Sequence, residues 1–166
     1  MFSVAPVLHP PAGTSREKAL ARAHLSAGWS KLPATNNLAR SFQDRLPELW
    51  QAPPGATLTF RFRGTAAGVY DLLGPDCGKL TVTVDDLKPV SIARFDSFCT
   101  YHRLSKFMAA EALTNGLHTV KIEVSSEALD KLSILSQRNE KMDNPKRFDG
   151  INWYAGSLLL MGDLVD

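Results

Sequence analysis

Residues 57–63, which read TLTFRFR, alternate strictly between polar and apolar side chains. Successive residues of a β-strand point to opposite faces of a sheet, so this alternation collects Leu58, Phe60 and Phe62 on one face. The stretch is therefore predicted to be a strand that is buried on one side. It follows a Pro-Gly pair, which is a turn signal, and the character of the chain changes at that point.

The same alternation recurs over residues 79–85 and 118–124. In the second of these stretches His118 lies on the apolar face, so it is predicted to be a core residue rather than a metal ligand. Weaker strands are predicted over residues 68–72, 90–95, 98–104, 129–135 and 151–165, a short helix over residues 105–113, and a long polar loop over residues 136–149. Short strands with little helix between them favour an all-β, antiparallel sandwich or barrel.

The N-terminal third of the chain is different, because residues 1–54 are rich in proline and lack the alternation. They are predicted to form an irregular extension that packs on a domain made by residues 55–166. Within the extension, residues 15–24 fit a short helix and residues 23–29 fit a first strand, and periodicity does not decide between the two.

Charge and hydropathy exclude several classes of partner. The formal net charge is +2, and acidic and basic residues are interleaved, so no nucleic-acid partner is predicted. No apolar run approaches the roughly 20 residues that span a bilayer, so no membrane segment is predicted, and no secretory signal is visible. Two cysteines, Cys77 and Cys99, are too few to indicate a disulfide framework, and the sequence leaves open whether they are bonded to each other.

An ordered series of short motifs connects the predicted strands. The motifs are FRFRGT at 60–65, GVYD at 68–71, GPDCG at 74–78, VTVD at 82–85, RFDSFCTYHR at 94–103 and GLHTVKI at 116–122. Their order and spacing over residues 55–165 resemble the galactose-binding-like jelly-roll domains that accompany SGNH/GDSL hydrolases, particularly esterases that act on acylated carbohydrates. The resemblance implies an antiparallel jelly-roll β-sandwich with one or two short helices.

The resemblance also implies a function, which is that of a non-catalytic carbohydrate-binding or accessory module. Its partners are then a glycan or a catalytic hydrolase domain, and its location is periplasmic or secreted. Without that association, the lack of a visible signal peptide is typical of a cytoplasmic protein. A structural or assembly role is a further alternative, because jelly rolls recur in shells and oligomers.

No complete catalytic apparatus is visible, so the sequence leaves enzymatic activity uncertain. An SGNH hydrolase needs a Gly-Asp-Ser block and a late Asp-x-x-His pair, and neither is present, since Gly162-Asp163 is followed by Leu164. The catalytic candidates are His102 and Asp96, which form a triad only if a nearby serine joins them in space. A stand-alone esterase with His102 as its base is therefore the alternative function.

The densest polar motif contains Asp96, Tyr101, His102 and Arg103 within eight residues. If residues 98–104 form a strand, Tyr101 and Arg103 lie on the face opposite His102, and both are predicted to contact a ligand. A packing interpretation competes with this one. In that interpretation Arg103 and Asp96 form an ion pair and Tyr101 is a half-buried core aromatic.

Aromatic residues near the C-terminus are candidates for stacking on sugars. Trp153 and Tyr154 are adjacent on a predicted strand and so face opposite ways, which leaves one of them as the surface candidate. Asp76, in the turn at 74–78, is a further binding candidate, although a short carboxylate there also caps backbone N–H groups. Trp29 and Trp50 are predicted to be packing residues.

No metal or cofactor is predicted from the residues. No Cys/His spacing fits zinc, and no phosphate-binding glycine loop is present. Jelly rolls of the resembled kind sometimes carry a structural Ca²⁺ ion, but the chain has no D-x-D-x-D loop that would hold one.

Overall fold

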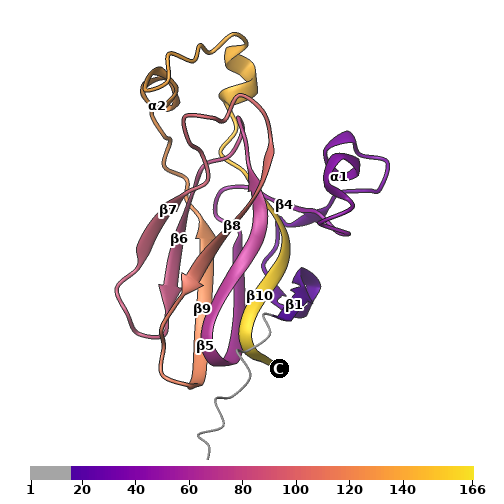
Figure 1. Ribbon diagram of the computed structural model, residues 1–166, viewed down its shortest axis with the longest axis vertical. Coiled ribbons are helices and arrows are strands. Elements are labelled where there is room, and N and C mark those ends of the chain that lie inside the picture. The colour runs from indigo at the N-terminus through magenta and orange to yellow at the C-terminus, as the bar shows by residue number, and fades with distance from the viewer. Residues whose placement is uncertain (1–15) are drawn as a thin grey trace, which may run out of the picture.

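The computed structural model describes residues 16–166, and in this part of the chain every pairing between strands is antiparallel. Figure 1 shows strands in the body of the molecule and short helices only at its periphery. The elements are β1 (Arg16–Ala19), η1 (Leu20–Arg22), β2 (His24–Leu25), β3 (Ser30–Lys31), α1 (Asn37–Phe42), β4 (Trp50–Ala52), β5 (Thr57–Leu73), β6 (Lys79–Val84), β7 (Val90–Ala93), β8 (Arg103–Ala110), β9 (Gly116–Val124), α2 (Lys131–Ser136), η2 (Pro145–Phe148) and β10 (Trp153–Val165).

Two long strands, β5 and β10, run side by side at the centre of the sheet (Figure 1). The first half of β5 pairs with β9, which continues through β6 to β7 at the edge. The second half of β5 pairs with β8, while β10 pairs on its other side with β1 and β4. We call β9, β6, β7 and the first half of β5 the first layer, and β8, β10 and the second half of β5 the second layer. The chain is therefore an all-β antiparallel sandwich with two short α-helices, and the predicted fold class is confirmed.

A glycine pair marks a point of very close approach between the two long strands. Gly64 lies opposite Gly162, next to an irregularity in the β5–β10 register. A Cβ atom added at Gly64 would lie 2.1 Å from the Met161 carbonyl oxygen, and one at Gly162 would lie 2.1 Å from the Arg63 carbonyl oxygen. Gly162 also has a φ of +146°, which disfavours any side chain. Two glycines therefore permit the backbone contact between these strands.

The core lies between the two layers and follows the predicted alternation. Leu58, Phe60 and Phe62 are buried, as are Leu80 and the valines of β6. The second layer contributes its own inward-facing residues, and these are Val69, Phe107, Trp153, Ala155, Leu158 and Leu160. Trp29 packs edge-on against Trp153, with ring centroids 5.4 Å apart, and Trp50 is partly buried against the same core. The expectation that both tryptophans serve packing is confirmed.

The N-terminal segment adds strands to the sheet and covers part of its outer surface. Strands β1 and β4 both pair with β10. Leu46 and Leu49 pack on Leu72 and Tyr154, which face outward from the second layer. The region for which a helix and a strand were equally favoured contains β1, the short 3-10 turn η1 and β2 in succession. The division of the chain at residues 54 and 55 stays a prediction.

Three of the predicted local structures are wrong. Most of the predicted helix over 105–113 is strand β8, because pairing with β5 outweighs local helix propensity. Residues 98–100 form a turn, and the strand begins only at Arg103. The predicted strand over 129–135 contains helix α2, in which Asp130 caps the N-terminus and Lys131 and Leu135 bury the same helix face. The loop over 136–149 contains the end of α2 and the 3-10 turn η2.

No helix between residues 16 and 166 is both long and apolar enough to cross a membrane.

Candidate functional site

Most of the residues singled out in the sequence lie at one end of the sandwich, here called the loop end. It is formed by residues 74–78, 94–102 and 125–152, and Figure 1 shows the last of these segments, with α2, projecting beyond the strands. Two hydrogen-bonded clusters of side chains organise its loops, and a third, fully buried cluster lies beneath them.

The first cluster is centred on Asp76. Its Oδ1 lies 2.7 Å from His102 Nε2, and its Oδ2 accepts a hydrogen bond from the Tyr154 hydroxyl. Burial raises the pKa of Asp76, but the hydrogen bonds from His102 and Tyr154 outweigh it, so the pKa lies below its usual value. The His102 ring packs so closely on Gly74 that a Cβ atom there would lie 2.2 Å from the ring. Asp76 and His102 therefore hold each other in a single arrangement.

The second cluster closes the turn before β8. Asp96 accepts hydrogen bonds from Arg103 and from the Phe98 backbone N–H, so the predicted ion pair between Asp96 and Arg103 is confirmed. The Cys99 thiol lies 3.3 Å from Asp96 Oδ1 and 3.7 Å from an Arg103 nitrogen. The turn is held on both sides by these contacts, which fixes the direction in which residues 98–101 project.

The buried cluster beneath the loops is centred on Asp71, whose side chain has no exposed surface. Arg94 donates two hydrogen bonds to its carboxylate, at 2.7 and 2.6 Å, and Trp153 Nε1 donates a third at 2.9 Å. Burial raises the pKa of Asp71 to about 6, although Arg94 and Trp153 both act in the opposite direction. Every partner of this carboxylate belongs to the core, so the cluster supports the fold.

The exposed aromatics at the loop end differ from those predicted. The expectation that Trp153 or Tyr154 faces solvent is wrong, because they are 0% and 5% exposed. Trp153 is buried because it faces the core, and Tyr154, on the opposite face, is buried because the N-terminal segment packs over it. Tyr101 is 57% exposed, so its interpretation as a half-buried core residue is also wrong. Tyr101 points outward because residues 97–101 form a turn that lies outside the sheet.

A second exposed aromatic, Phe98, lies in the same turn as Tyr101 and is 44% exposed. The Arg138 guanidinium lies 3.7 Å from the centre of the Phe98 ring, and Arg103 lies 5.4 Å from it. Phe98 is therefore engaged by two cations, whereas Tyr101 makes no aromatic or cation contact within the described part of the chain. Sequence reasoning missed Phe98, which appeared only as part of a predicted strand.

The proposed catalytic triad is not assembled. His102 pairs with Asp76 rather than with Asp96, which is occupied by Arg103. The Ser105 hydroxyl accepts a hydrogen bond from Arg94, and no hydrogen bond joins a serine to His102 within residues 16–166. These residues therefore lack the nucleophile–base contact that defines hydrolytic triads.

A buried lysine at the loop end was not predicted. The Lys131 ammonium donates hydrogen bonds to the carbonyl oxygens of Pro75, Phe148 and Gly150, at 2.7, 2.9 and 2.6 Å. An ammonium has three N–H donors, and all three are used here. Burial lowers the pKa of Lys131. The only sequence signal was the spacing of four residues between Lys131 and the apolar Leu135, which is a helical spacing.

Metal and redox chemistry find little support in the described residues. Residues 16–166 contain no group of three or more His, Cys, Asp and Glu side chains placed to hold a metal ion. Cys77 and Cys99 are both buried and free, and burial raises the pKa of each thiol. His118 packs against Phe62 and lies 2.7 Å from Asp85, at the edge of the core rather than within it.

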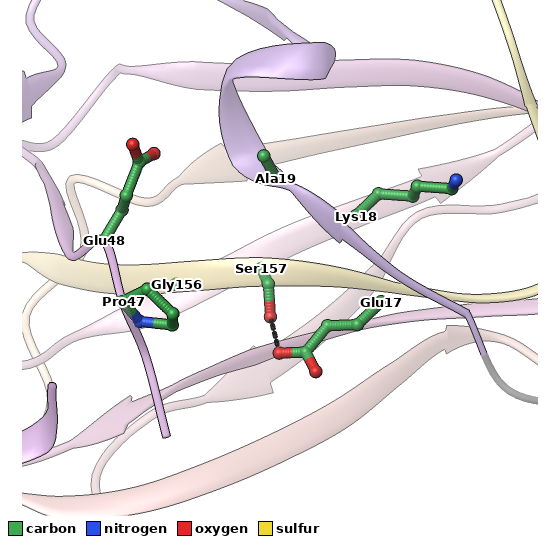
Figure 2. A pocket seen from close by; sticks show the side chains of 7 residues that line it. All are labelled: Glu17, Lys18, Ala19, Pro47, Glu48, Gly156 and Ser157. Carbon is green, nitrogen blue, oxygen red and sulfur yellow. Dashed lines mark hydrogen bonds between the residues drawn. The ribbon is translucent and has the colours of Figure 1, made fainter. Parts of the chain in front are cut away.

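A pocket of about 370 Å³ lies away from the loop end, between β1, residues 47–48 and β10. Figure 2 shows Glu17 and Ser157 beside it, joined by a hydrogen bond of 2.6 Å from the serine hydroxyl to the carboxylate. Glu48 lines the opposite side. The sequence could not indicate this pocket, because Glu17 and Ser157 are 140 residues apart and meet only through strand pairing.

Solved structures of carbohydrate-active enzymes contain the same fold. The chain matches a two-domain esterase active on acetylated mannans with a TM-score of 0.59 and 16% identity, over 100% of this chain and 40% of that one. It matches a family two carbohydrate esterase from Cellvibrio japonicus with a TM-score of 0.50 and 13% identity, over 91% of this chain and 34% of that one. An exo-β-1,3-galactanase from Phanerochaete chrysosporium matches with a TM-score of 0.50 and 10% identity, over 88% of this chain and 29% of that one.

These matches define how far the likeness extends. The resemblance to a jelly-roll part of carbohydrate esterases is confirmed for the fold, and the chain spans at most 40% of the length of these three structures. No protein-family model matches the sequence, and no curated protein sequence matches it significantly.

Proposed function

We propose that this chain is a non-catalytic module of a carbohydrate-active hydrolase and that it binds glycan at the loop end. The observation that carries the proposal is the exposed ring of Tyr101, which projects from a turn braced by two side-chain clusters. An aromatic ring complements the C–H face of a sugar, and a turn that is already braced loses little conformational entropy when its ring binds.

Polar groups next to Tyr101 supply the hydrogen bonds that a sugar requires. His102 and Asp76 remain about one quarter exposed, as does Arg103. The Arg103 Nε–H is buried without a hydrogen-bond partner among residues 16–166, so only the exposed part of this guanidinium can reach a ligand. In this proposal Tyr101 and Arg103 contact the ligand together with the exposed edges of His102 and Asp76, and Tyr154 holds Asp76 in position.

The fold likeness supports the association with a hydrolase. The best supported of the three matches is a two-domain esterase that was crystallised with mannopentaose, and this chain corresponds to less than half of it. Mannopentaose is therefore the first probe to use.

Isothermal titration with mannopentaose tests the binding proposal. Tyr101→Ala is expected to weaken binding about tenfold, because it removes the stacking surface. Leu117→Ala is the matched control, since Leu117 is also a large exposed apolar residue but lies on β9, outside the loop end. Absence of binding by the unmodified chain to mannopentaose, cellohexaose and galactose at millimolar concentration would contradict glycan recognition.

The size of the matched structures favours a second role, which is packing against a catalytic domain. Expression of the full open reading frame tests it. If the loop end is the docking surface, Tyr101 becomes protected from solvent in the longer protein, and hydrogen exchange of residues 96–102 slows. If hydrogen exchange of residues 96–102 is unchanged in the longer protein, the loop end is not the docking surface.

A further inference from the structure

A separate hollow of about 210 Å³ lies on the outer face of the second layer, where β8, β5 and β10 run side by side (Figure 1). The residues that line it are Tyr70, Lys106, Met108, Leu159, Leu160 and Met161. Its volume is below the roughly 300 Å³ at which sites for drug-sized ligands begin, so it suits a unit the size of one sugar residue.

Strand register explains how the hollow forms. Tyr70 is paired with Lys106 on one side and Ser157 on the other, so these three side chains form one row across the outer face. Gly68 is paired with Met108 and Leu159 in the next row and contributes no side chain. A Cβ atom at Gly68 would lie 2.8 Å from the Met108 sulfur, so a larger residue would disturb the wall of the hollow.

The one charged residue among those that line this hollow is basic, while Glu17, on β1 opposite Leu159, accepts a hydrogen bond from Ser157. The Arg45 guanidinium lies 5.7 Å from the centre of the Tyr70 ring, and Lys106 lines the hollow itself. Both residues are exposed, and neither takes part in an ion pair within residues 16–166. No acidic residue lines the hollow, whereas the pocket of Figure 2 is lined by Glu17 and Glu48.

We propose that this hollow binds an anionic sugar residue of a polysaccharide, one that carries a carboxylate or a sulfate group. The Tyr70 ring offers a stacking surface for the C–H face of the sugar, and Met108 and Leu159 complete an apolar wall. The Lys106 ammonium then meets the anionic substituent, with Arg45 adding to the positive potential. The site is distinct from the loop end and goes beyond the function proposed there.

Titration with two charged probes and one neutral probe tests the assignment. The probes are trigalacturonate, a sulfated galactose trisaccharide and unsubstituted galactotriose, each at low and at physiological salt. We expect at least one charged probe to bind the unmodified chain about fivefold more tightly than galactotriose, and added salt to reduce the difference. The charged probe that binds better identifies the anionic group.

Variants locate the site and separate this proposal from the previous one. Lys106→Glu is expected to remove the preference for the charged probe, while Lys121→Glu, which alters an exposed lysine on the other layer, leaves it unchanged. The loss of charged-probe affinity caused by Lys106→Glu is expected to be the same with and without Tyr101→Ala, so failure at the loop end and failure here are distinguishable. A thermal melt confirms that each variant is folded.

Three results would overturn the proposal. They are equal affinity for charged and neutral probes, a charge preference that survives in Lys106→Glu, and competition by hexaglutamate peptide as strong as that by trigalacturonate. The last result would mean that the hollow recognises an acidic peptide instead of a sugar.

Discussion

Two regions of this sandwich are stabilised in different ways. In the strand half, made of β6, β9 and the first half of β5, buried side chains are apolar and alternate with exposed polar ones. At the loop end, Asp71, Arg94 and Lys131 are buried, and each depends on particular partners. Apolar burial is non-directional and roughly proportional to area, whereas a buried charge is tolerated only when its hydrogen bonds are complete.

This difference bears on the proposed function. A region held by directional hydrogen bonds between particular partners has few alternative arrangements, which suits a surface that must present the turn of Tyr101 in a fixed position. The strand half does not need side chains fixed by directional hydrogen bonds, because its role is to provide the core. The comparison predicts that small chemical changes cost more at the loop end than small changes of volume cost in the strand half.

The largest expected effect is that of Asp71→Ala, which leaves the Arg94 guanidinium buried without its carboxylate. We expect a loss of about 3–5 kcal/mol in the free energy of unfolding, measured by urea denaturation. Ile122→Val, which trims one methylene from a fully buried residue in the strand half, is expected to cost only about 1 kcal/mol.

The double variant Asp71→Leu with Arg94→Met provides the control for Asp71→Ala, because it removes both charges. It is expected to be more stable than Asp71→Ala, since no uncompensated charge remains. Equal losses for Asp71→Ala and Ile122→Val would remove the proposed contrast between the two regions.

A smaller effect is expected for Lys131→Met, which keeps the length of the side chain but removes its three donors. Three carbonyl oxygens then lose their partner, and we expect a loss of about 2 kcal/mol together with faster hydrogen exchange in residues 145–150. The matched control is Lys141→Met, an exposed lysine in the same segment, which is expected to change stability by less than about 0.5 kcal/mol. Similar behaviour of the two variants would show that the Lys131 hydrogen bonds contribute nothing.

The smallest effect is a pH dependence at the edge of the strand half. The hydrogen bond to Asp85 raises the pKa of His118 above 6.5, and the Thr114 carbonyl acts in the same direction. A raised folded-state pKa stabilises the fold fully below 6.5, and this contribution disappears as the pH rises through the folded-state value. The melting temperature should therefore fall as the pH rises above about 6.5, and His118→Gln should reduce that fall. A parallel decline in both proteins would contradict the assignment to His118.

Much of the fold could be predicted, because alternation over residues 57–63, 79–85 and 118–124 reports directly which side chains are inward. The errors are concentrated at the loop end and around β8. There, residues 98–101 leave the sheet and α2 replaces a predicted strand. Local propensity fails in these places because tertiary pairing and capping by a single aspartate decide the outcome.

For the candidate site, the sequence predicted several of the residues but few of the contacts between them. Asp76, Tyr101, His102 and Arg103 were identified from the sequence, as was the Asp96–Arg103 ion pair. The contacts between Asp76, His102 and Tyr154, which span up to 78 residues, were not. The exposure of Tyr101 follows from a turn, and the burial of Tyr154 follows from the N-terminal segment packed over it, and no periodicity reveals either of them.

By itself, the order of apolar and polar residues determined that the chain forms paired antiparallel strands around an apolar interior. Strand formation could be predicted because it depends on a local alternation of apolar and polar side chains every two residues. Only the tertiary structure decided which polar groups form hydrogen bonds or ion pairs inside the protein and which remain exposed on the surface. The reason is physical: a hydrogen bond depends on the positions of two atoms that are distant in the chain, and those positions exist only after β5 and β10 have brought the layers together.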